Sequence, residues 1–192
     1  MMPTRRQFSL SLLVLAALPA GCGSPNPDLL TLDAVPGVVR PGGPHTVLLQ
    51  DIAVAPYLDR KAIVRSSEGY HIEVATNDWW GEPFTAMLGR VLSAEIEQRL
   101  PATTVFTEAS AVDVRPNATV AINITRFDEA VNGSVVLVAQ MGVSFAHKPR
   151  ATVTEGIRFV VPVTGKGVTA QAASMSVALG RLSDRVAEAL AR

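Results

Sequence analysis

Cys22 is the only cysteine of the chain, and its thiol stands where lipid could be attached. An apolar run, Phe8 to Leu18, precedes it, and the small residues Ala20 and Gly21 come directly before it. This order is typical of a lipobox, in which the thiol forms a thioether with diacylglycerol and the chain is cut before the cysteine. Pro19 makes the box imperfect, because a branched apolar residue is usual there. The alternative is a buried free thiol after an ordinary signal. We favour the lipid anchor.

Residues 1–21 are therefore predicted to be an export signal. Arg5 and Arg6 form its positive region, and the apolar run after them is shorter than the ~20 residues that a membrane-spanning helix needs. The run Thr4-Arg5-Arg6-Gln7-Phe8 resembles a twin-arginine signal. We favour that export route, and the ordinary Sec route stays open.

The charge balance gives no reason to expect nucleic acid as a partner. The chain has 17 Lys and Arg and 17 Asp and Glu, and the signal holds two arginines and no acid, so the mature net charge is about −2. A mature length of about 170 residues suits one domain with its own core. A single cysteine excludes an internal disulfide bond.

No catalytic, metal or cofactor motif is found in the mature chain. The histidines His45, His71 and His147 are scattered, without partners at metal-site spacing. Asp128 and Glu155 are single carboxylates on predicted strands, and neither a nucleophile elbow nor a phosphate loop occurs. We expect no enzyme activity, no metal and no cofactor.

Three short clusters mix aromatic, apolar and basic residues, a composition enriched at protein interfaces. The candidate partner-contact residues are Tyr57, Leu58, Arg60, Trp79, Trp80 and Arg126. The tryptophans could instead fill the core or staple a helix, and one ring could point in and the other out. Arg126 could instead pair with Asp128 or Glu82.

The elements that must position these residues follow from hydrophobic periodicity. Residues 22–45, rich in Pro and Gly, are predicted to be a flexible lipidated tether with a short edge strand at 29–32. Residues 46–192 are predicted to form the folded domain. Strands are expected at 46–55, 62–65, 70–75, 118–127, 134–145 and 152–163.

Two helices are expected, at 82–100 and 172–190, with Asn77 or Asp78 as the start signal of the first. Its apolar face includes Leu88 and Ile96, and Arg99 falls off that face. The strand at 134–145 is apolar on both sides, which is typical of a central strand covered on both faces. These elements predict a single compact α/β domain with a mixed sheet flanked by helices in three layers.

The order of several short motifs resembles the ABC-type transport auxiliary lipoproteins, the PqiC-like family of membrane integrity-associated transporter subunits. These motifs are Pro56-Tyr57-Leu58-Asp59-Arg60, Ile63-Val64-Arg65, Trp79 to Pro83, Val91-Leu92, Arg99-Leu100-Pro101, Arg126-Phe127, Ala173-Ser174-Met175-Ser176, Ala178-Leu179 and Leu182-Ser183. The resemblance covers about Leu29 to the C-terminus. Trp80-Gly81, where a single Trp before a small residue is more usual, and the segment 148–154 depart from the pattern.

The resemblance implies a non-enzymatic subunit that works with an ABC permease, an ATPase and a periplasmic protein carrying mammalian-cell-entry (MCE) domains. Such systems move lipids or other hydrophobic molecules between the inner and outer membranes. We expect a docking or scaffold subunit, anchored through Cys22 by acyl chains such as palmitate at the periplasmic face of the outer membrane, since Gly23 gives no acidic retention signal. A homo-oligomer is compatible with this role.

Two other functions stay open. A periplasmic lipid carrier would need a cavity lined by residues such as Phe84, Leu88, Met141 and Phe145. A periplasmic hydrolase would need a cleft with convergent titratable groups, for which the sequence has no signature.

Overall fold

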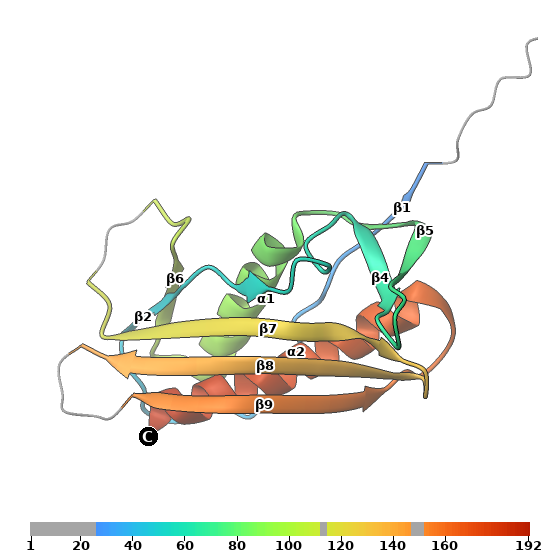
Figure 1. Cartoon of the computed structure of the whole chain (residues 1–192). Coiled ribbons are helices and arrows are strands. Elements are labelled where there is room, and N and C mark those ends of the chain that lie inside the picture. The colour runs from blue at the N-terminus through green and yellow to red at the C-terminus, as the bar shows by residue number, and fades with distance from the viewer. Residues whose placement is uncertain (1–25, 112–114, 147–151) are drawn as a thin grey trace, which may run out of the picture.

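The computed structural model describes residues 26–111, 115–146 and 152–192 (Figure 1). The predicted export signal and Cys22 lie outside the described residues. Within the described part, one mixed sheet, one small sheet and two helices build a single α/β domain, which confirms the predicted fold class.

The larger sheet has six strands in the order β6-β2-β7-β8-β9, with β3 also beside β7. Its strands are β2 (Thr46–Leu49), β3 (Ala53–Val54), β6 (Thr104–Thr107), β7 (Ala118–Ala130), β8 (Ser134–Phe145) and β9 (Val153–Pro162). β2 is parallel to both β6 and β7, whereas β7, β8 and β9 form an antiparallel meander. The β7–β8 turn lies at the predicted Asn132-Gly133, where Gly133 has a φ of 72°.

A smaller sheet stands at one end of the larger one, in the order β1 (Asp28–Leu30), β5 (Glu73–Trp80) and β4 (Ala62–Ser66). The predicted hairpin is confirmed, but its second strand runs on to Trp80. Asn77 and Asp78 are therefore strand residues and not a helix start. The cause is tertiary, because β5 hydrogen-bonds to β1 on one side and to β4 on the other.

Both helices, α1 (Phe84–Arg99) and α2 (Gly167–Ala191), lie side by side on the same face of the larger sheet (Figure 1). The predicted apolar stripes of both are buried, from Leu88 and Ile96 on α1 to Leu179 and Leu182 on α2. The layering differs from the expected sheet between helices, because both stripes pack on the one apolar face that the meander offers.

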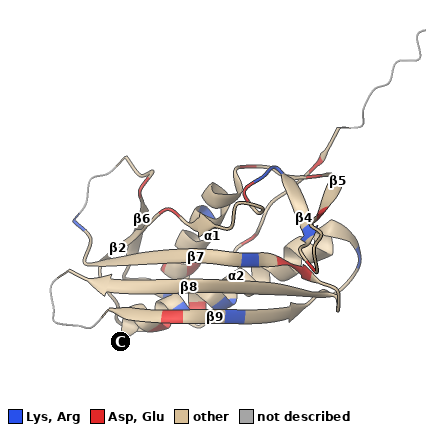
Figure 2. Cartoon of the chain, in the orientation of Figure 1, with Lys and Arg blue, Asp and Glu red and all other residues tan. Residues whose placement is uncertain are grey.

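The other face of the meander is open along most of its length. Exposed residues of alternating positions point out from it: Ala121, Asn123, Gln140, Ser144, Thr154 and Arg158. Figure 2 shows few charged positions along the three strands of the meander and none on β8. Double coverage of β8, expected from its sequence, is found only near its start, where Val136 is buried.

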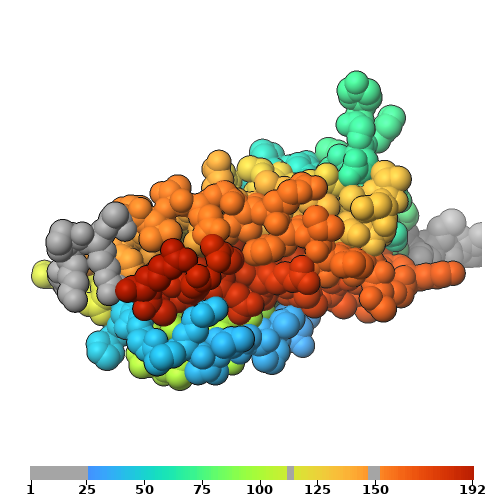
Figure 3. Space-filling model, turned by 90° about the horizontal axis from the view of Figure 1, so that it is seen from below, coloured from blue at the N-terminus to red at the C-terminus, as the bar shows by residue number. Residues whose placement is uncertain are grey.

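The segment from Thr31 to Pro44, here called the N-terminal strap, runs along both helices rather than standing free. Figure 3 shows it beside α2. Leu32 is 1% exposed, the Asp33 N–H donates to Ser176 Oγ, and the Pro44 carbonyl accepts from the Thr103 hydroxyl. The predicted tether over 22–45 is therefore corrected: from β1 onward these residues belong to the folded domain. A Pro- and Gly-rich composition lowers regular structure without preventing docking onto an apolar surface.

Candidate functional site

The six candidate partner-contact residues fall in different environments. Leu58 and Trp80 are core residues, 3% and 6% exposed. The Trp80 ring stacks on Phe84, with centroids 5.4 Å apart and 24° between the planes. Trp79, next to it on β5, points the other way and is 36% exposed. One ring in and one out is thus the alternative that the structure supports, because neighbouring strand residues face opposite sides.

Tyr57 and Arg126 meet at a buried carboxylate. Asp128 on β7 has no exposed surface. Its Oδ2 accepts from the Tyr57 hydroxyl at 2.8 Å and from the Ser67 hydroxyl at 2.5 Å, and its Oδ1 accepts from Arg126 Nε at 2.9 Å. Arg126 Nη2 also pairs with Glu68 at 2.6 Å. This Asp128 cluster holds the β3–β4 segment and the β4–β5 loop against β7.

The cluster is built to keep its carboxylate paired. The pKa of Tyr57 is raised to about 12, chiefly by burial and also by the hydrogen bond to Asp128, against the opposing effect of the Ser67 hydrogen bond. Tyr57 is therefore a neutral donor at physiological pH. The predicted pairing of Arg126 with Asp128 is present, whereas Glu82 pairs with Arg90 instead. A carboxylate with donors on both oxygens and no exposure is suited to structure rather than to proton transfer.

An exposed surface lies on the outer side of β1 and β5, and we call its members Leu29, Arg60, Lys61 and Trp79 the β1–β5 surface. Leu29 and Trp79 are register partners on the two parallel strands. Leu29 is 66% exposed. Together with Pro83 these residues line a shallow hollow of about 430 Å³. Of the six candidates, Arg60 and Trp79 are thus the two that lie in exposed positions.

A second hollow, of about 610 Å³, follows the outer side of α1. Small residues of the helix form its floor, and the far wall includes Ile52 and Val105; the helix residues are Ala86, Gly89, Ser93 and Ala94. The side chains proposed for a lipid cavity lie elsewhere: Phe84, Leu88 and Met141 are buried in the packed core, and Phe145 packs against it.

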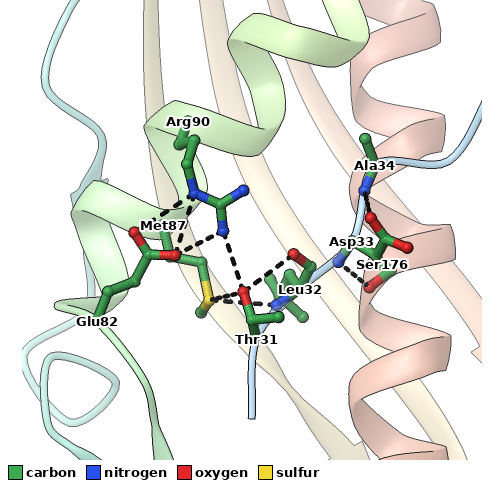
Figure 4. A network of polar contacts seen from close by, with 8 residues as sticks. All are labelled: Thr31, Leu32, Asp33, Ala34, Glu82, Met87, Arg90 and Ser176. Atoms are coloured by element: carbon green, nitrogen blue, oxygen red, sulfur yellow. Dashed lines mark hydrogen bonds and ion pairs between the residues drawn. The ribbon is translucent and has the colours of Figure 1, made fainter.

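The strap is held by polar contacts as well as by Leu32. Met87 Sδ on α1 accepts from the Leu32 N–H at 3.2 Å (Figure 4). Arg90 on α1 links the strap to Glu82, which lies just before the helix. Its Nη2 contacts both the Thr31 hydroxyl, at 3.0 Å, and the Glu82 carboxylate. These contacts come from three separate parts of the chain, so they join the strap, α1 and the short connection between β5 and α1.

Further along, a buried ionic group joins the strap to both helices. Glu95 and Arg99 on α1 are each 1% exposed. Glu95 accepts from the Val35 N–H at 2.8 Å and from the Ser183 hydroxyl at 2.6 Å. Arg99 Nε pairs with Asp184 on α2 at 2.6 Å. Burial raises the pKa of Glu95, although both hydrogen bonds and Arg99 oppose the shift.

This buried ionic group was not predicted from the sequence. Arg99 was expected on the wet side of its helix, and Glu95 was not singled out. The available signal was their spacing, because a Glu and an Arg four residues apart share one side of a helix. Two chemical features are absent from the described residues: a cluster of three or more potential metal ligands, and a helix long and apolar enough to cross a membrane.

The fold and these surfaces define a class: a one-domain α/β protein whose N-terminal strap is docked across its helices. A family model for the ABC-type transport auxiliary lipoprotein component matches residues 29–187. The chain belongs to this family, which confirms the resemblance and makes it an auxiliary lipoprotein of an ABC-type transport system.

Solved structures share the fold. One titled an uncharacterized protein matches with a TM-score of 0.70 and 15% identity over 86% of this chain and 99% of that one. Protein XCC0632 from Xanthomonas campestris, of the DUF330 family, matches with a TM-score of 0.65 and 18% identity over 86% of this chain and 95% of its own. No significant match is found among curated proteins.

Proposed function

We propose that this protein is the lipid-anchored docking subunit of an MCE-type ABC transport system. It stands at the periplasmic face of the outer membrane and receives the distal end of the tunnel formed by an MCE-domain protein. The observation that carries the proposal is the family match over residues 29–187, on a chain whose Cys22 has a lipobox arrangement. The cargo of such a system would be lipids or other hydrophobic molecules.

The role proposed is mechanical rather than chemical. The buried carboxylates of the described residues, Asp128 and Glu95, accept hydrogen bonds that tie segments of the chain together. A rigid domain with a docked strap suits a fixed attachment point. Partner contact would use surface outside these clusters, because Leu58 and Trp80 are buried in the core and Tyr57 and Arg126 are bound to Asp128.

Crosslinking in cells tests the docking role. The full chain with a C-terminal tag should co-purify with the MCE-domain protein, the permease and the ATPase of the same organism after mild crosslinking. The matched control is Cys22→Ala, which should leave the membrane fraction and lose most of the crosslinked partner. Intact chain that captures no MCE-domain protein would refute the docking role. Cys22→Ala chain that stays membrane-bound would refute the anchor.

A lipid carrier is the second candidate, and the hollow along α1 is the observation in its favour. The cavity first expected for it, between helix and sheet, is filled by core side chains. Native mass spectrometry of the domain separates the two roles, because a carrier retains lipid at a fixed stoichiometry and a docking subunit does not.

A further inference from the structure

The docked strap limits how far the domain can stand from its anchor. Asn26 is held to β5, because its carbonyl accepts from the Asn77 side chain at 3.1 Å. Cys22 is four residues earlier in the chain. Since an extended chain spans at most ~3.6 Å per residue, Asn26 lies within ~15 Å of a lipidated Cys22 and the start of β1 within ~22 Å. In a chain anchored through Cys22, the end of the domain that holds β1 therefore stays close to the membrane surface.

That end carries the β1–β5 surface. Leu29, directly after the start of β1, is exposed beside Trp79, and the hollow next to them brings in Arg60 and Lys61. Within the described residues neither of these two bases forms an ion pair, whereas the nearby Glu82 is paired with Arg90. Asp59 is the remaining acid of the hollow. With Arg60 and Lys61 it leaves the hollow a net charge of one positive.

The two acids next to this apolar pair face elsewhere. Asp28 and Asp78 are register partners, one position along from Leu29 and Trp79, and they line a separate hollow against α2. Alternation along a strand thus directs Asp28 and Asp78 to the side of the small sheet opposite Trp79. The outer side combines a Trp ring, a leucine and two bases.

Such a combination matches the interface of a lipid bilayer. Tryptophan is enriched at the headgroup level because its ring is apolar and its indole N–H is polar. Lys and Arg are attracted to anionic headgroups, and their long stems cover apolar surface. A protein partner would explain an exposed Trp equally well, but the short connection to Cys22 brings lipid to this surface first.

We propose that the β1–β5 surface rests on the lipid headgroups of the membrane that holds Cys22. The contact orients the domain, with the opposite end of the larger sheet, where β6 and the start of β7 lie, directed away from the membrane. The proposal rests on the lipid anchor proposed above. It assigns Trp79 and Arg60 to lipid rather than to the MCE partner.

The test is fluorescence quenching by brominated lipids. Full-length lipidated protein is reconstituted into vesicles of phosphatidylethanolamine and phosphatidylglycerol, with and without acyl chains brominated near the headgroup. Trp79 should be quenched and Trp80, shielded in the core, should not. Trp79→Phe should therefore lose the quenching, and the emission of the intact protein should shift to shorter wavelength on reconstitution. Leu29→Cys, labelled with an environment-sensitive dye, gives a second readout in which both tryptophans are kept.

Charge is tested in the same vesicles. Arg60→Glu with Lys61→Glu should reduce quenching of Trp79, and Arg158→Glu on the open sheet face is the matched control that should leave it unchanged. Flotation of the vesicles reports the anchor separately. Protein that floats without quenching, or without a dye response at position 29, overturns the headgroup contact and leaves the anchor intact. Protection of Trp79 by the MCE partner alone would make this surface a protein interface. Protein that fails to float overturns both.

Discussion

Trp79 and Trp80 are consecutive residues of β5 whose side chains point to opposite sides of the small sheet. Trp80 stacks on Phe84 at 5.4 Å in the core, and Trp79 lies in register with Leu29 on the outer side. The pair thus connects the first helix to the exposed end of the domain within two residues. Because one ring is buried and the other is exposed, the same substitution should change the stability of the protein differently at the two positions.

We expect Trp80→Ala to lower the free energy of unfolding by about 3–5 kcal/mol, because it empties a buried aromatic site. Trp79→Ala should change it by less than about 1 kcal/mol, since its ring is partly solvated. Urea unfolding of the two variants measures the difference. Equal losses would mean that Trp79 is also a core residue.

The Asp128 cluster should make stability fall at high pH. The pKa of Tyr57 is about 12 in the folded protein against 10.0 for an ordinary tyrosine. The raised pKa contributes its full stabilisation below pH 10, and that contribution is lost as pH rises from 10 to about 12.

Tyr57→Phe should remove this part of the alkaline loss and cost about 1 kcal/mol near neutral pH for the missing hydrogen bond. Tyr70→Phe, at a fully exposed ring, is the control. The measurement is the free energy of unfolding of the parent and both variants, obtained by chemical unfolding across pH 8–12. An unchanged alkaline slope in Tyr57→Phe would contradict the assignment.

Glu95 should produce a second pH dependence of the same sign in a lower window. Its folded pKa is raised by burial above the ordinary 4.5. The stabilisation that this shift gives is complete below pH 4.5 and is lost as pH rises through the folded pKa.

Glu95→Gln keeps an acceptor for the Val35 N–H and cannot ionise. Relative to the parent chain, its free energy of unfolding should therefore improve as pH increases from about 4.5. Glu73→Gln, at an exposed residue of β5, should run parallel to the parent. A parallel course for Glu95→Gln would show that Glu95 has an ordinary pKa.

The strap should be released by a methyl group at Gly37. A Cβ there would overlap the guanidinium of Arg99, which is held by Asp184 and by the Gly180 carbonyl and cannot move aside freely. We expect Gly37→Ala to speed hydrogen exchange in the strap, at Val35 and Arg40, whose N–H groups are bonded to α1.

Gly89→Ala is the contrasting substitution, because a Cβ at this helical position meets no atom within 4 Å. It should stabilise the protein by up to about 1 kcal/mol through helix propensity. Exchange rates of the strap in Gly89→Ala should match those of the parent. Unchanged strap exchange in Gly37→Ala would contradict the close packing of Gly37 on Arg99.

Local patterns were sufficient for most of the elements and for the fold class. Alternation and helical periodicity depend on neighbours within a few residues, so the strands around Val120 and Leu137 and both helices were predicted close to their observed bounds. Asn132-Gly133 defined the hairpin turn for the same reason. Family membership followed from short motifs whose order along the chain is independent of how the chain folds.

The tertiary structure alone decided what each polar side chain does. Burial of Arg99 depends on α2 supplying Asp184 from 85 positions later, and the pairing of Tyr57 with Asp128 spans 71. The Pro- and Gly-rich strap looked like a tether because its composition lacks periodicity, yet it docks where two helices offer an apolar seam and a buried Glu95. The sequence determined the anchor candidate and most of the elements. Long-range packing determined that the folded domain begins within a few residues of Cys22, which is why the β1–β5 surface faces the membrane in our proposal.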